Sequence, residues 1–213
     1  MTFRDPRSLL AEGRGLYLVL TSPAVPHVQL ARAACERGVP ALQLREKELP
    51  DDELLHLASE LTTLTRDYPT LFIVNDRPDI AARCGADGVH LGRADEEIGV
   101  ARRLLPPEAI VGLSTRTPDE ALAALAVGAD NIGVGPIFPT GSKPDALEPI
   151  GLGGMKAVAE SVPDLPKIAI GGITAGTAAD VLRAGAQYVA VISAVCRADD
   201  PIAAIDAFVD ATR

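Results

Sequence analysis

The stretch LFIVNDRPDIAARCGADGVHL, residues 71–91, contains the unit that decides the fold. Its apolar run Leu71–Asn75 predicts a strand, and Ile80–Cys84 predicts a short helix. Gly85 stands where a left-handed residue commonly ends a helix, and a second apolar run, Gly88–Leu91, follows after two residues. A strand, a helix and a second strand joined by such short turns are typical of repeated βα units.

The same pattern recurs along the chain. The turn GADGV at 85–89 returns as GADNI at 128–132 and GAQYV at 185–189. The clearest helix is Asp51–Arg66, which has an acidic start and a stripe of leucines. The strands expected from apolar runs are Gly15–Thr21, Ala41–Leu44, Leu71–Asn75, Gly88–Leu91, Ile110–Ser114, Asn131–Gly135, Lys167–Ile170 and Tyr188–Ser193.

Eight such strands with short returns predict an α/β fold, a (β/α)8 TIM barrel that forms a single domain over residues 1–213. An open doubly wound sheet is the alternative, but it usually has fewer strands and gives no reason for the regular turns. The sequence therefore favours the closed barrel, in which functional side chains lie at the carboxyl ends of the strands.

The composition excludes several classes of partner. A net charge of −9 with 3% aromatic residues offers neither a basic face for nucleic acid nor a platform for stacked bases. No apolar run approaches the ~20 residues that span a bilayer, and charges interrupt the first residues, so a cytoplasmic protein without membrane contact is expected. The three cysteines are far apart in sequence, which favours buried reduced thiols. The sequence leaves a homo-oligomer open.

Polar residues gather where the predicted strands end. Strand two leads into Gln43, Arg45, Glu46 and Lys47, and the other polar strand ends are Asn75, Asp76 and Arg77, His90 followed by Asp95, Ser114, and Ser193. Because all strands of a parallel barrel end at one face, these side chains are expected to share a pocket.

The segment QLREK, residues 43–47, alternates along an extended chain, so Gln43, Arg45 and Lys47 are expected on one side and Leu44 and Glu46 on the other. Arginine binds phosphate oxygens with two parallel bonds and lysine acts as a point charge, a pair that suits a diphosphate. A solvated charge run is the alternative interpretation of the same residues.

Asp76 and Asp95 follow adjacent predicted strands, so their carboxylates can approach a common point. One or two carboxylates completed by water and substrate phosphate are what Mg2+ prefers. An acid and base pair, or an N-cap at Asp95, are alternatives that the sequence leaves open. Nothing supplies the cysteine and histidine cluster typical of zinc sites.

Two further segments point to phosphate binding. The run IAIGGIT places Gly172 after the seventh strand, where glycine lets the main chain approach a phosphate, and Ser193 ends the eighth. The segment Phe138–Gly153 is rich in glycine and proline and is predicted to be an active-site loop, with Thr140, Ser142 and Lys143 as its hydroxyls and cation. A solvent-exposed lysine is the alternative for Lys143.

The segments QLREK, IVNDRPDIA, GADGVHLGRAD, VGLST, GADNIGVGPIFPTGSK, IAIGGIT and YVAVISAV, in this order, resemble the thiamine-phosphate synthase family over residues 15–194. The resemblance implies a barrel that joins hydroxymethylpyrimidine diphosphate to thiazole phosphate with release of pyrophosphate, assisted by Mg2+ and without a protein nucleophile. It implies Mg2+ ligands at Asp76 and Asp95 and pyrimidine diphosphate contacts at Gln43, Arg45, Lys47, Asn75 and Lys143. It further implies that Ser114 and His90 lie at the pyrimidine, and that the thiazole phosphate is held by Thr140, Ser142, Gly172, Ile192 and Ser193.

The resemblance assigns the reaction itself to Arg45, Lys47, Lys143 and Ser114. The chain departs from the family pattern at Arg93, where glutamine is expected, and at Ser142, where threonine is expected.

Three other functions compete with this interpretation. They are a thiazole tautomerase of the same fold, a barrel phosphate isomerase that uses a carboxylate base, and a non-catalytic phosphate sensor. The tautomerase resembles the synthase but uses a histidine base after strand five, where this chain reads STRT with Arg116.

Overall fold

A computed structural model describes residues 5–92, 98–141 and 148–213. Within these residues, eight parallel strands close into a barrel in sequence order. They are β1 (Gly15–Leu20), β2 (Ala41–Leu44), β3 (Leu71–Asn75), β4 (Gly88–Leu91), β5 (Ile110–Thr115), β6 (Asn131–Val134), β7 (Lys167–Ile170) and β8 (Tyr188–Val191). Because β8 pairs with β1, the predicted TIM barrel is confirmed and the open sheet is wrong.

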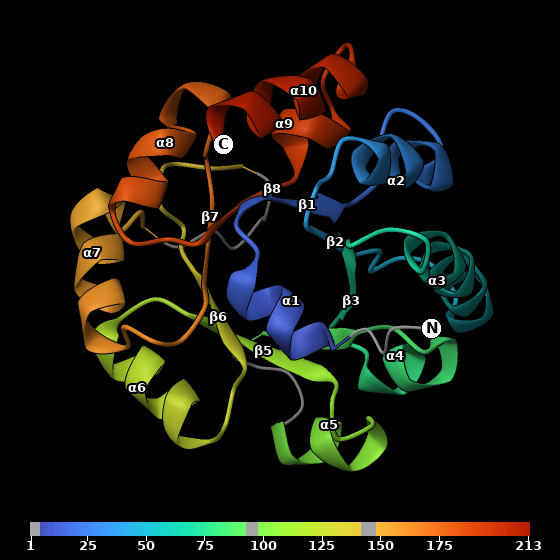
Figure 1. Cartoon of the computed structure of the whole chain (residues 1–213), viewed down its shortest axis with the longest axis horizontal. Coiled ribbons are helices and arrows are strands. Elements are labelled where there is room, and N and C mark those ends of the chain that lie inside the picture. The colour runs from blue at the N-terminus through green and yellow to red at the C-terminus, as the bar shows by residue number, and fades with distance from the viewer. Residues whose placement is uncertain (1–4, 93–97, 142–147) are drawn as a thin grey trace.

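Helices surround the barrel as a ring (Figure 1). They are α2 (His27–Glu36), α3 (Asp51–Thr65), α4 (Pro78–Cys84), α5 (Ile98–Leu104), α6 (Pro118–Ala126), α7 (Gly151–Ser161), α8 (Ala175–Arg183) and α10 (Pro201–Ala211). The helix α7 begins at Gly151, so the loop predicted over Phe138–Gly153 ends earlier than expected. None of the helices in the described part of the chain is both long and apolar enough to cross a membrane.

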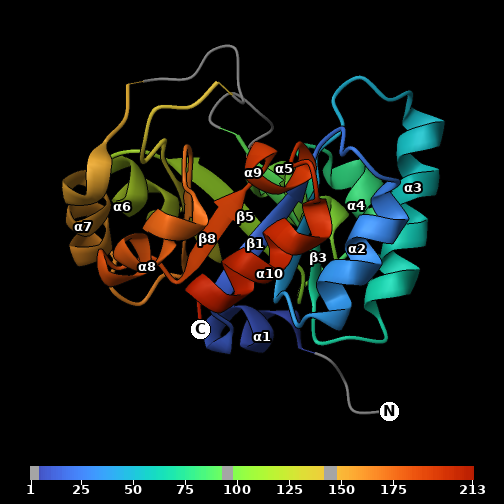
Figure 2. The ribbon, with the colours of Figure 1, turned by 90° about the horizontal axis from the view of Figure 1, so that it is seen from above.

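Two short helices were not predicted from the sequence. The helix α9 (Ser193–Cys196) begins where the eighth strand was expected to continue. The helix α1 (Pro6–Glu12) covers the end of the barrel at which the strands begin (Figures 1 and 2). Leu10 of α1 packs among apolar side chains of the barrel interior, where burying one leucine contributes about 2 kcal/mol.

Side chains in the recurring turns before β4, β6 and β8 form hydrogen bonds at the amino end of the barrel. Gly85, Gly128 and Gly185 all have positive φ, as the helix caps predict. Asp87 and Asp130 each accept a hydrogen bond from a backbone N–H of the preceding strand, at 2.7 Å. The third turn carries Gln187 instead, whose amide donates to carbonyls of the α1 segment. The amide of Gln187 acts as a hydrogen-bond donor where the aspartates are acceptors, because its neighbours are carbonyl oxygens of α1.

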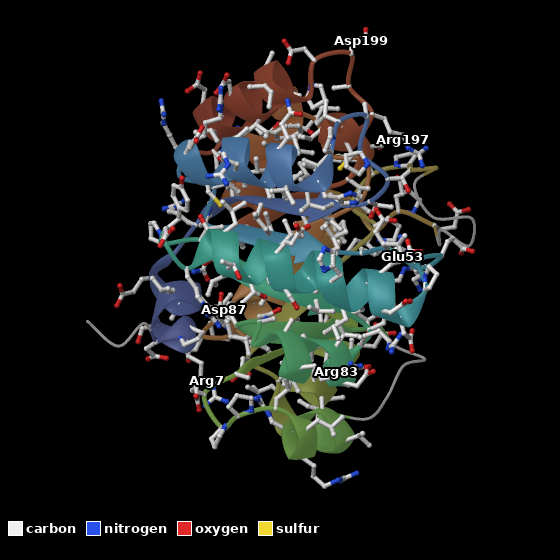
Figure 3. The ribbon with its side chains drawn as sticks, turned by 90° about the vertical axis from the view of Figure 1, so that its right-hand side faces the viewer. Arg7, Glu53, Arg83, Asp87, Arg197 and Asp199 are labelled. Atoms are coloured by element: carbon white, nitrogen blue, oxygen red, sulfur yellow. The ribbon has the colours of Figure 1, made fainter. Side chains whose placement is uncertain are left out.

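A second core lies between the outer faces of the strands and the helices, and it contains the buried cysteines Cys35, Cys84 and Cys196, which form no disulfide. Charged side chains occupy the outside of the molecule (Figure 3). Arg7 and Asp87 lie toward the end of the barrel covered by α1, and Glu53 and Arg197 lie toward the opposite end. Because α1 covers the amino end of the barrel, that end is closed, whereas the carboxyl end is open and holds the site.

Candidate active site

A cavity of about 390 Å3 opens at the carboxyl ends of the strands. Figure 2 shows α1 at the other end of the barrel. It is lined by every predicted site residue that the structure describes: Gln43, Arg45, Lys47, Asn75, Asp76, His90, Ser114, Thr140, Gly172, Ile192 and Ser193. Asp95, Ser142 and Lys143 lie outside the described residues, as does Arg93. The strand ends therefore share one pocket for these residues, whereas Glu46 and Arg77, which were also expected there, do not line it.

The strand β2 and the residues after it supply the cationic wall. Gln43, Arg45 and Lys47 line the cavity, whereas Leu44 packs in the outer core, so the predicted alternation is confirmed. Gln43 is 5% exposed and its amide donates to the hydroxyl of Tyr17 at 2.9 Å. Burial raises the pKa of Tyr17 far above its usual value, although the bond from Gln43 acts in the opposite direction. Tyr17 is therefore a neutral phenol that orients Gln43.

Asp76 projects into the cavity from the end of β3. Its φ of 61° lies in the left-handed region, and its backbone N–H donates to the carbonyl of His90 on the adjacent strand at 2.8 Å. Its carboxylate lies 3.1 Å from the ammonium of Lys47. The turn is thus held by a backbone hydrogen bond to β4, and the carboxylate it carries is paired with the cationic wall.

The oxygen donors at this point fit Mg2+. Asp76 and Asn75 both line the cavity, and the described residues contain no cluster of three or more histidine, cysteine or acidic side chains. Mg2+ needs only one or two carboxylates when phosphate and water complete its shell, so Asp76 would serve as one ligand. The second predicted ligand, Asp95, is outside the described residues.

His90 and Ser114 form a pair on the neighbouring strands β4 and β5. The Nε2 atom of His90 lies 2.9 Å from the hydroxyl oxygen of Ser114. Two glycines make room for the imidazole, because a Cβ added at Gly112 would lie 2.8 Å from its Nδ1 and one at Gly133 2.9 Å from its Cε1. The ring is therefore fixed by backbone on one side and by Ser114 on the other.

Another part of the cavity wall lies at the ends of β7 and β8. Gly172 after β7 and Ile192 and Ser193 after β8 line it. Gly172 has a φ of 63°, and an added Cβ would lie 2.4 Å from the carbonyl oxygen of Pro139. The sequence interpretation attributed this glycine to the approach of a phosphate, but the packing of the β6–α7 loop already requires it.

Comparison with known proteins decides the family. Residues 16–195 match the family model described as thiamine monophosphate synthase. The chain belongs to the thiamine monophosphate synthase family. The thiamine-phosphate synthase of Moorella thermoacetica is 50% identical over 192 residues, 89% of this chain and 91% of that protein. That of Methanoregula boonei is 46% identical over 178 residues, 84% and 82% of the two chains.

A solved structure agrees with this assignment. The thiamine phosphate pyrophosphorylase from Pyrococcus furiosus superposes with a TM-score of 0.84 at 39% identity, and the match covers 96% of each chain. The resemblance drawn from the sequence motifs is therefore confirmed at the level of the thiamine monophosphate synthase family.

Sequence reasoning did not identify Tyr17, which is hidden within the apolar run of β1 but lines the cavity and accepts a hydrogen bond from Gln43 of the neighbouring strand. Arg77 follows the same strand end as Asp76, but its guanidinium pairs with Asp51 and Asp79. His27 at the start of α2 is 22% exposed, and its side chain bonds to Glu46. These three residues depend on contacts between separate loops or strands, which sequence spacing does not encode.

Proposed function

We propose that this chain is a thiamine-phosphate synthase that transfers the hydroxymethylpyrimidine group from its diphosphate to the nitrogen of thiazole phosphate. The products are thiamine phosphate and pyrophosphate. The observation that carries the proposal is the convergence of Gln43, Arg45, Lys47, Asn75 and Asp76 on one cavity, in a chain 50% identical to a named thiamine-phosphate synthase. The cavity volume of about 390 Å3 lies within the range of small-molecule sites.

The residues divide into two anion sites. Gln43, Arg45, Lys47 and Asn75 bind the diphosphate, with Lys143 as a further cation. Thr140, Ser142, Gly172, Ile192 and Ser193 hold the thiazole phosphate, much of it through main-chain N–H groups, as is common after strands seven and eight of such barrels. An acidic chain needs this concentration of cations because its overall charge of −9 opposes anionic substrates.

The reaction needs charge stabilisation more than a nucleophile. Departure of pyrophosphate builds negative charge, which Arg45, Lys47 and Lys143 would stabilise. Mg2+, held by Asp76 and Asp95, would neutralise further charge on the leaving group. The aminopyrimidine delocalises the positive charge left on its methylene carbon, and the thiazole nitrogen attacks that carbon. Ser114, held by His90, positions the pyrimidine ring.

The tautomerase alternative gains no support from the loop after β5. The segment STRT at 114–117 lacks the expected histidine, and the guanidinium of Arg116 instead donates to the carbonyl of Glu148 at 2.6 Å. Arg116 therefore holds the return from the β6–α7 loop.

One assay separates the candidate functions. Purified protein supplied with both substrates and Mg2+ should release pyrophosphate and form thiamine phosphate in equal amounts, and omission of either substrate should abolish both. A tautomerase or isomerase would convert a single substrate without releasing pyrophosphate. A phosphate sensor would bind phosphate but convert neither substrate. The absence of product from folded protein would therefore contradict the proposal.

Gly133→Ala tests the His90 pair. The added Cβ would press on the imidazole at 2.9 Å from Cε1 and 3.2 Å from Nε2, the atom that bonds to Ser114. We expect turnover to fall roughly tenfold, because small displacements of positioning groups are costly. Steady-state kinetics with saturating substrates would measure the change.

Gly153→Ala is the matched control, since nothing lies within 4 Å of its added Cβ and it stands inside α7. That variant should keep full turnover and equal or higher thermal stability, because alanine favours helix. Equal rates for the two variants would contradict a role for the His90 position.

A further inference from the structure

We propose that Glu46 is a positioning residue for the diphosphate site, because it ties the segment that carries Arg45 and Lys47 to the loop after β1. The inference rests on the proposed function, in which these two cations bind the diphosphate. Glu46 lies between them in the sequence, yet it points to the other side of the segment and takes no part in the chemistry described above.

The carboxylate of Glu46 has two anchors in the β1–α2 connection. It accepts a hydrogen bond from the backbone N–H of Ser22, and one oxygen lies 2.7 Å from Nε2 of His27, the first residue of α2. The side chain of Glu46 is only 10% exposed. Ser22 has a φ of 39°, an uncommon value for serine, so its N–H is directed at Glu46 by a specific turn.

Two more hydrogen bonds join the same segments. The backbone N–H of Arg45 donates to the carbonyl of Leu20, and the hydroxyl of Thr21 donates to the carbonyl of Arg45, both at 2.9 Å. Bonds at the end of β1 and in the residues that follow it, Leu20, Thr21 and Ser22, therefore fix Arg45 and Glu46. Because side chains alternate in an extended segment, holding Glu46 on one side holds Arg45 and Lys47 on the cavity side.

Charge alone predicts the opposite effect, which makes the inference testable by its sign. Burial favours the neutral acid, but the bonds from His27 and Ser22 outweigh it and hold the pKa of Glu46 below its usual value, so the side chain is an anion. An anion near a diphosphate site repels the ligand. If Glu46 acted only through its charge, its removal would tighten diphosphate binding; if it positions the cations, removal weakens binding.

The experiment compares Glu46→Ala and Glu46→Gln with the unaltered protein by calorimetric titration of inorganic pyrophosphate with Mg2+. We expect Glu46→Ala to weaken binding roughly tenfold, the loss of one charge-assisted hydrogen bond, and to raise KM for the pyrimidine diphosphate while KM for thiazole phosphate stays unchanged. Glu46→Gln retains an acceptor for the Ser22 N–H and should bind within about threefold of the unaltered protein.

Glu60→Ala is the matched control, because Glu60 also pairs with a histidine, His56, at 3.8 Å, but on the exposed surface of α3. It should leave pyrophosphate affinity unchanged. Thermal unfolding of each variant shows whether the barrel is intact. Should Glu46→Ala fail to fold, His27→Ala takes its place, since it removes one of the two anchors of the carboxylate and should weaken pyrophosphate several-fold.

The outcomes separate the two proposals. Pyrophosphate binding equal to or tighter than that of the unaltered protein in folded Glu46→Ala, or in His27→Ala where that replaces it, overturns the positioning role. An equal loss of pyrophosphate binding in Glu46→Gln also overturns it, because the hydrogen bond that this variant keeps would then not preserve binding. Failure of the unaltered protein to make thiamine phosphate from both substrates would instead overturn the proposed function, whatever Glu46 does.

Discussion

Asp76→Asn is expected to lower turnover by roughly 100- to 1,000-fold while the barrel stays folded, because one charged ligand at the leaving pyrophosphate is lost. Asparagine is the appropriate replacement, since it tolerates the left-handed φ of 61° at this position better than alanine. Pyrophosphate release at saturating substrates and Mg2+ measures the effect, and Mn2+ binding followed by electron paramagnetic resonance reports the metal site independently of turnover.

Asp79→Asn is a suitable control, because Asp79 is an aspartate three residues away whose carboxylate pairs with Arg77 at 2.7 Å. Its turnover should change little. Asp95→Ala should reproduce the loss seen at Asp76 if both aspartates bind Mg2+. Full turnover of either metal-site variant in the presence of a chelator would exclude the metal assignment.

Arg45→Ala should weaken binding of the pyrimidine diphosphate about 100-fold, because it removes the cation that can form two parallel bonds to phosphate oxygens. The main-chain wall at Ile192 and Ser193 stays in place, so affinity for thiazole phosphate should be unchanged. Separate calorimetric titrations of the two substrates would measure both values.

Ser193→Ala provides the reciprocal variant and should weaken only the thiazole phosphate. Gly172 is less suitable for this purpose, because any side chain there meets the carbonyl of Pro139 and disturbs the loop. If Arg45→Ala weakened only the thiazole phosphate, or Ser193→Ala only the diphosphate, the division into two anion sites would be wrong.

The local patterns of the chain predicted most of the barrel. Gly85, Gly128 and Gly185 marked three helix ends, and the structure gives all three positive φ. The strand bounds differ by only a few residues from those expected; the largest difference is at β8, which ends at Val191 because α9 begins two residues later, at Ser193. The helix α1 was missed because it is short and charged outside, and its apolar face is defined only by the barrel end that it covers.

The location of the site was also determined by the sequence, because a parallel barrel brings every strand end to one face. Once Gln43, Asn75, His90 and Ser114 were assigned to the ends of strands, a shared pocket followed from topology alone. The alternation of QLREK further determined that Arg45 and Lys47 face the same side.

Only the tertiary structure decided how these side chains are held. Each of the deciding contacts lies between different strands or loops. They are the bond from Gln43 to Tyr17, the space that Gly112 and Gly133 leave for His90, and the anchoring of Glu46 by His27. Periodicity encodes which way a side chain points from its own element, but not the distance to a side chain on another element. That distance depends on the register of the closed barrel, which exists only after all eight strands have paired.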